Sequence, residues 1–219
     1  MRYVYKIVLI ILIVSCNESN TQPAPPPADS IVKKMDSVIA KPVITDSVVW
    51  VKDDTALINL SGQILRSLKA KNYKALAALI HPAWGVRLSP YGHVDTLHDK
   101  ILSAEKLYQL AKSPKKISWG NYDGTGDSIK LSVADYFKKF VFDVDFLTAK
   151  DKSINSFVNN DSSFTNLRSA YPSGGFTQFH IPGINPKYSG MDFKTLILVF
   201  KKENEKAWLV GVVHDQWRA

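Results

Sequence analysis

The sequence lacks most of the features that would indicate a redox or catalytic function directly. Its 219 residues contain a single cysteine, Cys16, so no disulfide can form within the chain. It has no glycine-rich phosphate loop, no nucleophile elbow and no cysteine–histidine arrangement, which removes the common motifs of nucleotide binding and nucleophilic catalysis. The positive charge, +8 at pH 7, is scattered in runs no longer than Lys-Lys, which argues against a nucleic-acid partner.

Long apolar runs and internal repeats are also missing. With 45% hydrophobic and 22% charged residues, the chain is neither a disordered tail nor a protein that crosses a membrane several times. The apolar run at residues 7–14 is shorter than the about 20 residues that a membrane-spanning helix needs. The composition therefore predicts one folded domain with short additional segments.

The N-terminal segment, MRYVYKIVLIILIVSC, has the form of an export signal, because Arg2 and Lys6 precede an apolar run of signal-peptide length. The run ends in Ile-Val-Ser-Cys, which resembles the lipobox of bacterial lipoproteins. This resemblance implies cleavage before Cys16 and acylation of that cysteine, palmitate included. It also implies a membrane-anchored, extracytoplasmic location in the bacterial cell envelope. The alternative is a plain signal anchor in which Cys16 has no role.

Residues 16–45 are predicted to be a tether. Pro23, Pro25, Pro26 and Pro27 favour extended, polyproline-like conformations. Residues 46–219 have the length of one domain with a substantial core. The expected organisation is a signal peptide at 1–15, a lipidated cysteine and tether at 16–45, and a single domain at 46–219.

Apolar spacing and turn residues predict that helices precede strands in this domain. Residues 153–168 are expected to be irregular or partly helical. Helices are expected after Asp54 through Lys69, at 73–80, from Ser103 and from Ser132, and strands at 85–88, near Val94, and at 117–119, 140–147, 175–181, 193–202 and 207–217.

Helices followed by a long antiparallel meander are typical of an α+β fold. The element order resembles the nuclear-transport-factor-2-like superfamily. That resemblance implies a cone-shaped architecture, in which N-terminal helices pack on a curved, mainly antiparallel sheet and leave a pocket. Three phrases, at 85–92, 135–146 and 208–217, together resemble a module of uncharacterised secreted and lipid-anchored bacterial proteins, and this second resemblance implies no catalytic residue.

Two aspartates are candidate acid and base groups. On a strand at 140–147, Asp143 and Asp145 would lie on one face about 6–7 Å apart. Paired carboxylates near that separation catalyse glycoside hydrolysis, and such a pair can also hold a hard cation. The alternative is an acidic pair on a solvated strand face, or partners of Arg87 and nearby lysines.

His214 lies at the polar end of the last predicted strand. Strict alternation predicts Val210, Val212 and His214 on one face, and Gly211 and Asp215 on the other. A histidine at the rim of a pocket can act as a base or as an orienting hydrogen-bond donor. A buried histidine with one partner explains the same position.

Arg87 precedes Ser-Pro-Tyr-Gly, a rigid turn. Such a turn would place the Arg87 guanidinium and the Tyr91 phenol at a pocket mouth, where they can hold a carboxylate or a phosphate. The alternative is an ion pair between Arg87 and Asp143 or Asp145.

Two segments carry possible metal ligands without a metal-site pattern. His93, Asp95, His98 and Asp99 are close in sequence, but their spacing is not the i, i+4 pair that holds zinc on a helix. Residues 121–127 resemble a calcium loop, but Ser132 occupies the position of the bidentate acid. No metal and no cofactor is expected.

Two classes of function remain, and a binding module is favoured because catalytic motifs are missing. It would bind a small molecule, a glycan or an envelope protein through the concave sheet and the aromatic loops at 153–188, including 171–176. Its candidate contacts are Arg87, Tyr91, His180 and Trp217.

The alternative is a pocket enzyme, hydrolase or isomerase-like. It would use Asp143, Asp145 and His214 as catalytic groups, with Arg87 and Tyr91 as substrate anchors.

Overall fold

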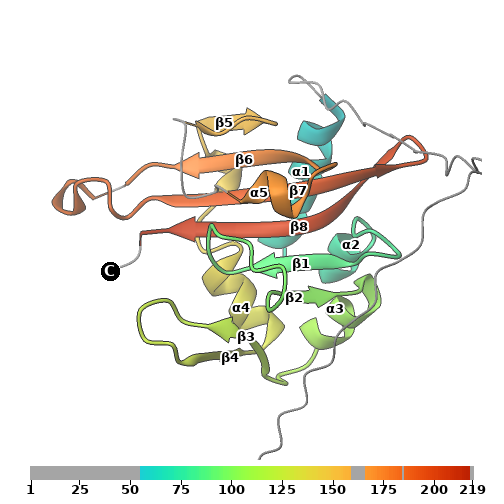
Figure 1. The fold of residues 1–219 in the computed structure, drawn as a ribbon, viewed down its shortest axis with the longest axis horizontal. Helices are drawn as coiled ribbons and strands as arrows, with labels where there is room; N and C mark the ends of the chain where they lie inside the picture. Colours follow the sequence, from blue (N-terminus) through green and yellow to red (C-terminus); the bar gives the residue numbers. More distant parts are fainter. Residues whose placement is uncertain (1–54, 159–165, 184, 218–219) are drawn as a thin grey trace, which may run out of the picture. The chain divides into compact units, whose positions relative to one another are not determined.

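A six-stranded sheet with helices on one face forms the fold in the computed structural model, which describes residues 55–158, 166–183 and 185–217 (Figure 1). The fold class is α+β, as predicted. The helical elements are α1 (Thr55–Lys69), α2 (Tyr73–Ala77), α3 (Ala104–Ala111), α4 (Val133–Phe140) and α5 (Leu167–Ala170), with short 3-10 turns η1 (Phe146–Thr148) and η4 (Pro186–Tyr188). The strands are β1 (Val86–Ser89), β2 (Lys100–Leu102), β3 (Ile117–Asn121), β4 (Ser128–Leu131), β5 (Asp151–Ile154), β6 (Gly175–Ile181), β7 (Lys194–Glu203) and β8 (Lys206–Gln216).

The strand order in the large sheet is β2-β1-β8-β7-β6-β5. Neighbouring strands are antiparallel except β1 and β8, which pair in parallel with Arg87 opposite Gly211. The hairpin β3-β4 forms a separate two-stranded sheet. The parallel pair brings an early segment of the domain beside its last strand.

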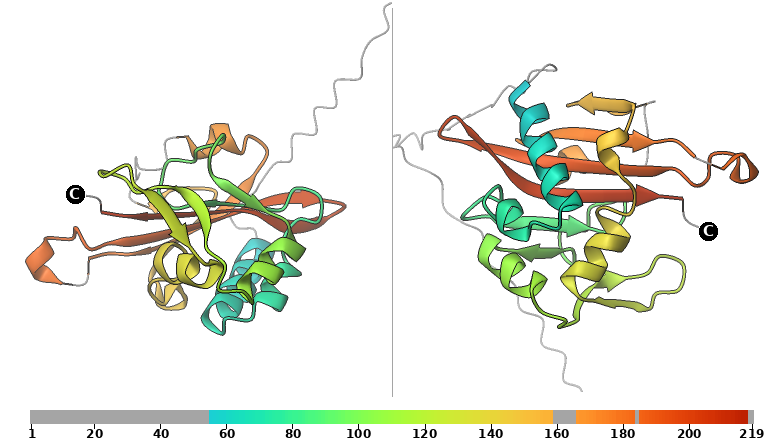
Figure 2. Two further views of the ribbon diagram at one scale, coloured as in Figure 1. Left: turned by 90° about the horizontal axis from the view of Figure 1, so that it is seen from below. Right: turned by 180° about the vertical axis from the view of Figure 1, so that it is seen from behind.

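Helices α1 to α4 lie on one face of the sheet, whereas α5 lies on the other (Figure 2). Leu57, Ile64 and Leu68 recur at helical spacing and form the buried stripe of α1. The side chains of Ser103 and Ser132 accept hydrogen bonds from backbone N–H groups in the first turns of α3 and α4. These caps explain why both helices begin where the sequence predicts.

The space between the helices and the sheet is filled with apolar side chains. A cavity lined by Ile64, Phe137 and Val212 measures about 10 Å³, no more than the volume that one water molecule needs. The space expected as a pocket on this side of the sheet is therefore nearly filled by side chains.

A bulge in β8 changes the predicted alternation of side chains. Val199 pairs with Gly211 and Phe200 pairs with Leu209, so Val210 is an extra residue. Leu209 and Val212 join the core under the helices, whereas Val210 packs in the cluster on the opposite face. The prediction that Val210 and Val212 share one face was wrong, because strict alternation makes no allowance for an inserted residue.

Two predicted strands were wrong. Residues 140–147 contain the end of α4, an irregular turn and η1, although their apolar residues alternate as in a strand. Val94 lies in the β1–β2 loop, where it is buried without being part of a strand. The alternation is one of sequence and not of burial, because Phe140, Val141 and Phe146 are buried and residues 142–145 are all partly exposed.

No helix among residues 55–158, 166–183 and 185–217 is both long and apolar enough to cross a membrane.

Candidate functional site

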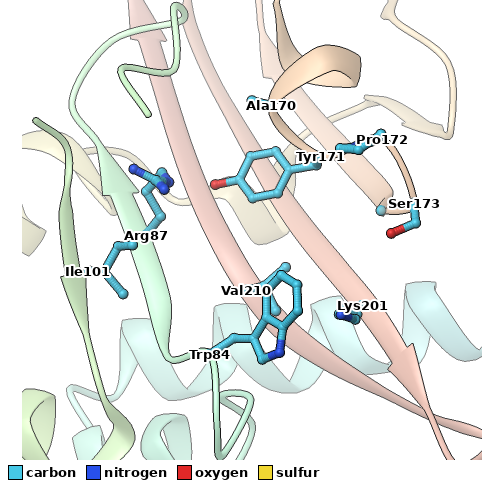
Figure 3. A pocket seen from close by; sticks show the side chains of 10 residues that line it. Trp84, Arg87, Ile101, Ala170, Tyr171, Pro172, Ser173, Lys201 and Val210 are labelled. Carbon is cyan, nitrogen blue, oxygen red and sulfur yellow. The ribbon is translucent and has the colours of Figure 1, made fainter. Parts of the chain in front are cut away.

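A pocket of about 190 Å³ lies on the sheet face that carries α5 (Figure 3). We call it the Arg87 pocket. Val210 of β8 and Ile101 of β2 contribute apolar surface, and the loop after α5, from Tyr171 to Gly174, forms another wall. None of the residues that line it is an aspartate or a glutamate, whereas Arg87 and Lys201 are both cationic. The pocket therefore has mainly apolar walls, and its charged side chains are positive.

Arg87 is oriented by the β1–β2 loop. Its Nη1 donates hydrogen bonds to the backbone oxygens of Asp95, at 3.2 Å, and of Thr96, at 3.0 Å. No carboxylate of the described residues lies within 4.0 Å of its guanidinium. The predicted ion pair with Asp143 or Asp145 was wrong, because both aspartates have other partners on the helix side.

Tyr171 brings its hydroxyl to the same end of the pocket as Arg87 (Figure 3). Burial raises the pKa of the Tyr171 phenol well above its ordinary value, although the charge of Arg87 acts in the opposite direction. The phenol therefore stays protonated and keeps its O–H as a donor. The ring fits because β8 has glycine at 211, where a Cβ would lie only 2.5 Å from the Tyr171 Oη.

Trp84 covers the other end of the pocket, and 60% of its surface is exposed. The Nζ of Lys201 lies 3.2 Å from the centroid of its ring, a cation–π contact. The turn that presents Trp84 is held by buried His81, whose Nδ1 accepts hydrogen bonds from the N–H groups of Ala83 and Trp84 at 3.2 Å each. The aromatic wall is thus supported from inside the fold.

Asp99 lies near Arg87 but lines a separate cleft of about 440 Å³. Its Oδ2 accepts hydrogen bonds from the Ser89 hydroxyl and from the N–H of Asp95, the latter at 2.9 Å. Partial burial raises the pKa of Asp99 to about 6, against the lowering effect of these hydrogen bonds and of Arg87. The carboxylate of Asp99 closes the base of the loop that orients Arg87.

Asp143 and His214 do meet, but under the helices and not in the Arg87 pocket. His214 Nε2 lies 3.2 Å from Asp143 Oδ1, and Lys194 Nζ lies 2.9 Å from Asp143 Oδ2. Burial alone would raise the pKa of Asp143, but the contacts with His214 and Lys194 outweigh it, so that the pKa is lowered. The result is a compact ion-paired cluster.

This cluster offers little access to a substrate. His214 has no exposed surface, and its Nδ1 is buried without a hydrogen-bond partner among the described residues. Asp143, 12% exposed, lines an open depression with Lys194 and Gln216, and His214 does not reach it.

Asp145 does not stand beside Asp143 on a strand. Its Oδ2 lies 2.6 Å from the Nζ of Lys69 on α1, and its Oδ1 accepts the N–H of Leu147 at 3.2 Å. The ion pair with Lys69 is the main reason why the pKa of Asp145 is lowered. Asp145 thus caps η1 and links it to α1, which is a structural role.

The other candidate ligand contacts are spread over the domain. Tyr91 lines the Asp99 cleft, and its hydroxyl accepts the N–H of Asp123 at 3.0 Å. His180 Nδ1 lies 2.8 Å from Thr195 Oγ1. Trp217 lines a further depression, which Tyr91 also lines, so these two predicted contacts do share one surface hollow. Of the predicted contacts, only Arg87 lies in the pocket of Figure 3.

No group of three or more His, Cys, Asp or Glu side chains suited to a metal ion occurs in the part of the chain that the structure describes. Among the segments considered for metals, Asp95 pairs with His98 at 2.7 Å, and Asp123 lies in a plain turn between β3 and β4.

No known family model matches this sequence, and a search of curated proteins finds no significant relative. The site is therefore interpreted from its own geometry. Sequence reasoning missed Trp84 and Lys201, but it selected Arg87 and the loop 171–176, of which residues 171–174 line the pocket. The missed residues are brought to the pocket by the parallel pairing of β1 with β8. Alternation of side chains within single strands does not reveal such a pairing.

Proposed function

We propose that this protein is a lipid-anchored envelope protein whose domain binds a small ligand in the Arg87 pocket. The observation that carries the proposal is the pocket itself, which combines apolar and aromatic walls with two cations and has no carboxylate lining. Ligand sites are usually concave, mainly apolar and supplied with a few oriented polar groups. Arg87, fixed by two backbone oxygens, is such a group.

Filling the pocket should abolish binding. Ile101 is 49% exposed on edge strand β2, so Ile101→Trp places extra volume into the mouth without opening the core. We expect at least tenfold weaker binding of any fragment that shifts the indole N–H resonance of Trp84 in NMR spectra of the full chain. The matched control is Leu97→Trp, at an 85% exposed position that does not line the pocket. Equal affinity of both variants for every fragment would exclude this pocket as the site.

The anchor is proposed from the lipobox at Cys16, with a signal peptide at 1–15, a tether at 16–45 and the domain at 46–219. All of the anchor and tether lie outside the described residues. In a bacterial host, Cys16→Ala should prevent fatty-acid labelling and release the protein from membranes, because acyl chains supply the membrane affinity. A Cys16→Ala protein that is still labelled and still sediments with membranes would contradict the anchor and leave the pocket untouched.

For the fold, we propose the cone-shaped, nuclear-transport-factor-2-like architecture. Helices on one face of a curved, mainly antiparallel sheet support it. The filled space beneath those helices means that the binding site proposed here lies on the opposite face.

One specific observation favours the enzyme hypothesis, namely the contact between Asp143 and His214. The hypothesis is less favoured because His214 is fully buried and Asp145 is engaged with Lys69. A base without access to substrate cannot transfer a proton directly.

A further inference from the structure

The size of the Arg87 pocket limits the ligand to a small molecule. An apolar cavity of about 150 Å³ accommodates benzene, and this pocket measures about 190 Å³. The difference leaves room for one small polar group on a six-membered ring. Nucleotides and oligosaccharides are too large to be enclosed.

The walls favour a flat apolar body. Trp84 and Tyr171 present aromatic rings from two directions, Val210 contributes aliphatic surface between them, and Ile101 lies beside Arg87 (Figure 3). Aromatic side chains form offset or edge-to-face contacts with other rings, which add about 0.5–1.5 kcal/mol per pair beyond the burial of apolar area. An aromatic ring therefore fits these walls.

The polar end of the pocket favours one planar anion. Nη1 of Arg87 already donates to the oxygens of Asp95 and Thr96, so the Nε and Nη2 side of the guanidinium remains as a single donor edge. Two parallel N–H groups match the two oxygens of a carboxylate. The Tyr171 hydroxyl lies at the same end (Figure 3), but its oxygen is buried, so Arg87 alone supplies the accessible donors there. A phosphoryl group has three terminal oxygens and up to two charges, for which this end has too few donors.

Lys201 contributes charge at a distance. It lies beside Trp84, on the other side of Val210 from Arg87 (Figure 3). A head group held by Arg87 therefore does not contact the Lys201 ammonium, which raises the local positive potential of the mouth.

We propose that the Arg87 pocket binds an aromatic monocarboxylate, with the carboxylate on Arg87 and the ring against Trp84, Tyr171 and Val210. This assignment rests on the proposed function and specifies the chemical class of its ligand. It commits the site to a planar acid, not to a phosphate ester and not to a neutral ring.

Four matched probes test it by NMR titration of the full chain, followed at the Trp84 indole N–H: benzoate, benzamide, phenylphosphonate and acetate. We expect benzoate to bind at least tenfold more tightly than each of the other three. Benzamide keeps the ring and the planar head without the charge, and acetate keeps the charge without the ring. Tighter binding of benzamide or phenylphosphonate than of benzoate would overturn the carboxylate assignment.

Two variants locate the interaction. Arg87→Met should weaken benzoate binding at least 20-fold and leave benzamide within threefold, provided that its melting temperature shows a folded domain. Lys201→Met, at the surface, should weaken benzoate binding only two- to fourfold. This variant replaces Arg87→Met as the test if Arg87→Met does not fold. No change in either variant would overturn the proposal.

The same data separate this inference from the proposed function. If benzamide or phenylphosphonate binds and Ile101→Trp blocks it, the pocket remains the ligand site and only the carboxylate assignment fails. If no probe and no other fragment shifts the Trp84 resonance, both fail.

Discussion

Gly211→Ala is expected to displace Tyr171 and to lower the free energy of unfolding by about 1–3 kcal/mol, the usual range for overpacking. A Cβ at this position would lie 2.5 Å from Tyr171 Oη, 2.9 Å from its Cζ and 3.1 Å from Val199 Cβ. The strand cannot withdraw, because β8 is hydrogen-bonded to β1 and to β7. The ring has to leave its site, and the Arg87 pocket then loses one of its walls.

A double-mutant cycle with Tyr171→Ala isolates this effect. In the Tyr171→Ala background the clash with the ring is removed, so Gly211→Ala should cost less than about 0.5 kcal/mol in chemical denaturation, which implies coupling between the two positions. If Gly211→Ala costs the same in both backgrounds, the contact with Val199 or strain within β8 is the cause, and the glycine has no role in shaping the pocket.

Asp99→Asn is expected to change how stability depends on pH. The pKa of Asp99 is raised to about 6 in the folded state, against about 3.9 when unfolded. The folded state therefore binds the proton more tightly than the unfolded state. The contribution of Asp99 is most favourable below pH 4 and is lost as the pH rises from 4 through 6.

Above pH 6, Asp99→Asn should be more stable than the wild type by roughly 1–2 kcal/mol. Two pKa units correspond to about 3 kcal/mol, which solvent screening at this partly exposed group reduces. Asparagine can place its carbonyl oxygen where Oδ2 accepts from Ser89 and Asp95, so the structure should be retained. The measurement is the free energy of unfolding of variant and wild type from pH 4 to 8. The contributions of the other carboxyl groups cancel in the difference between the two proteins.

Asp95→Asn supplies a control of opposite sign in the same loop. The hydrogen bond to His98 is the main cause that lowers the pKa of Asp95, so its stabilisation is present above the unfolded pKa and is lost as the pH falls. Asp95→Asn should thus be less stable than wild type near neutral pH, with a difference that shrinks in acid. A parallel pH profile for both variants would contradict the assignment of the two carboxyl groups.

Local sequence patterns predicted the elements in which all side chains of one face share one environment. Helix α1 has a regular apolar stripe, and β6, β7 and β8 have long β-branched and aromatic runs, so their positions agree with the prediction within a few residues. The segment 140–147 was wrong because Phe140 and Phe146 are buried in the same core from a helix end and a 3-10 turn. Apolar residues alternate in the sequence there, but their burial does not alternate and is set by tertiary packing.

The pocket was only partly predictable for a related reason. Arg87 and the loop 171–176 stood out by composition, but Trp84 and Lys201 are ordinary residues in sequence. They become neighbours through the pairing of β1 with β8 and of β8 with β7. A single sequence carries little information on such long-range registers.

The position of β8 also bears on the order of folding. Among the described residues it is the last strand in sequence, and it lies between β1 and β7, so β1 and β2 have no place in the large sheet until it is present. A ribosome delivers β1 long before β8, and closure between distant segments is the slow step in forming such sheets. The sheet can be completed only after synthesis of residues 206–216. Until then the strands on the two sides of β8 lack the strand that joins them, and the core stays unfinished.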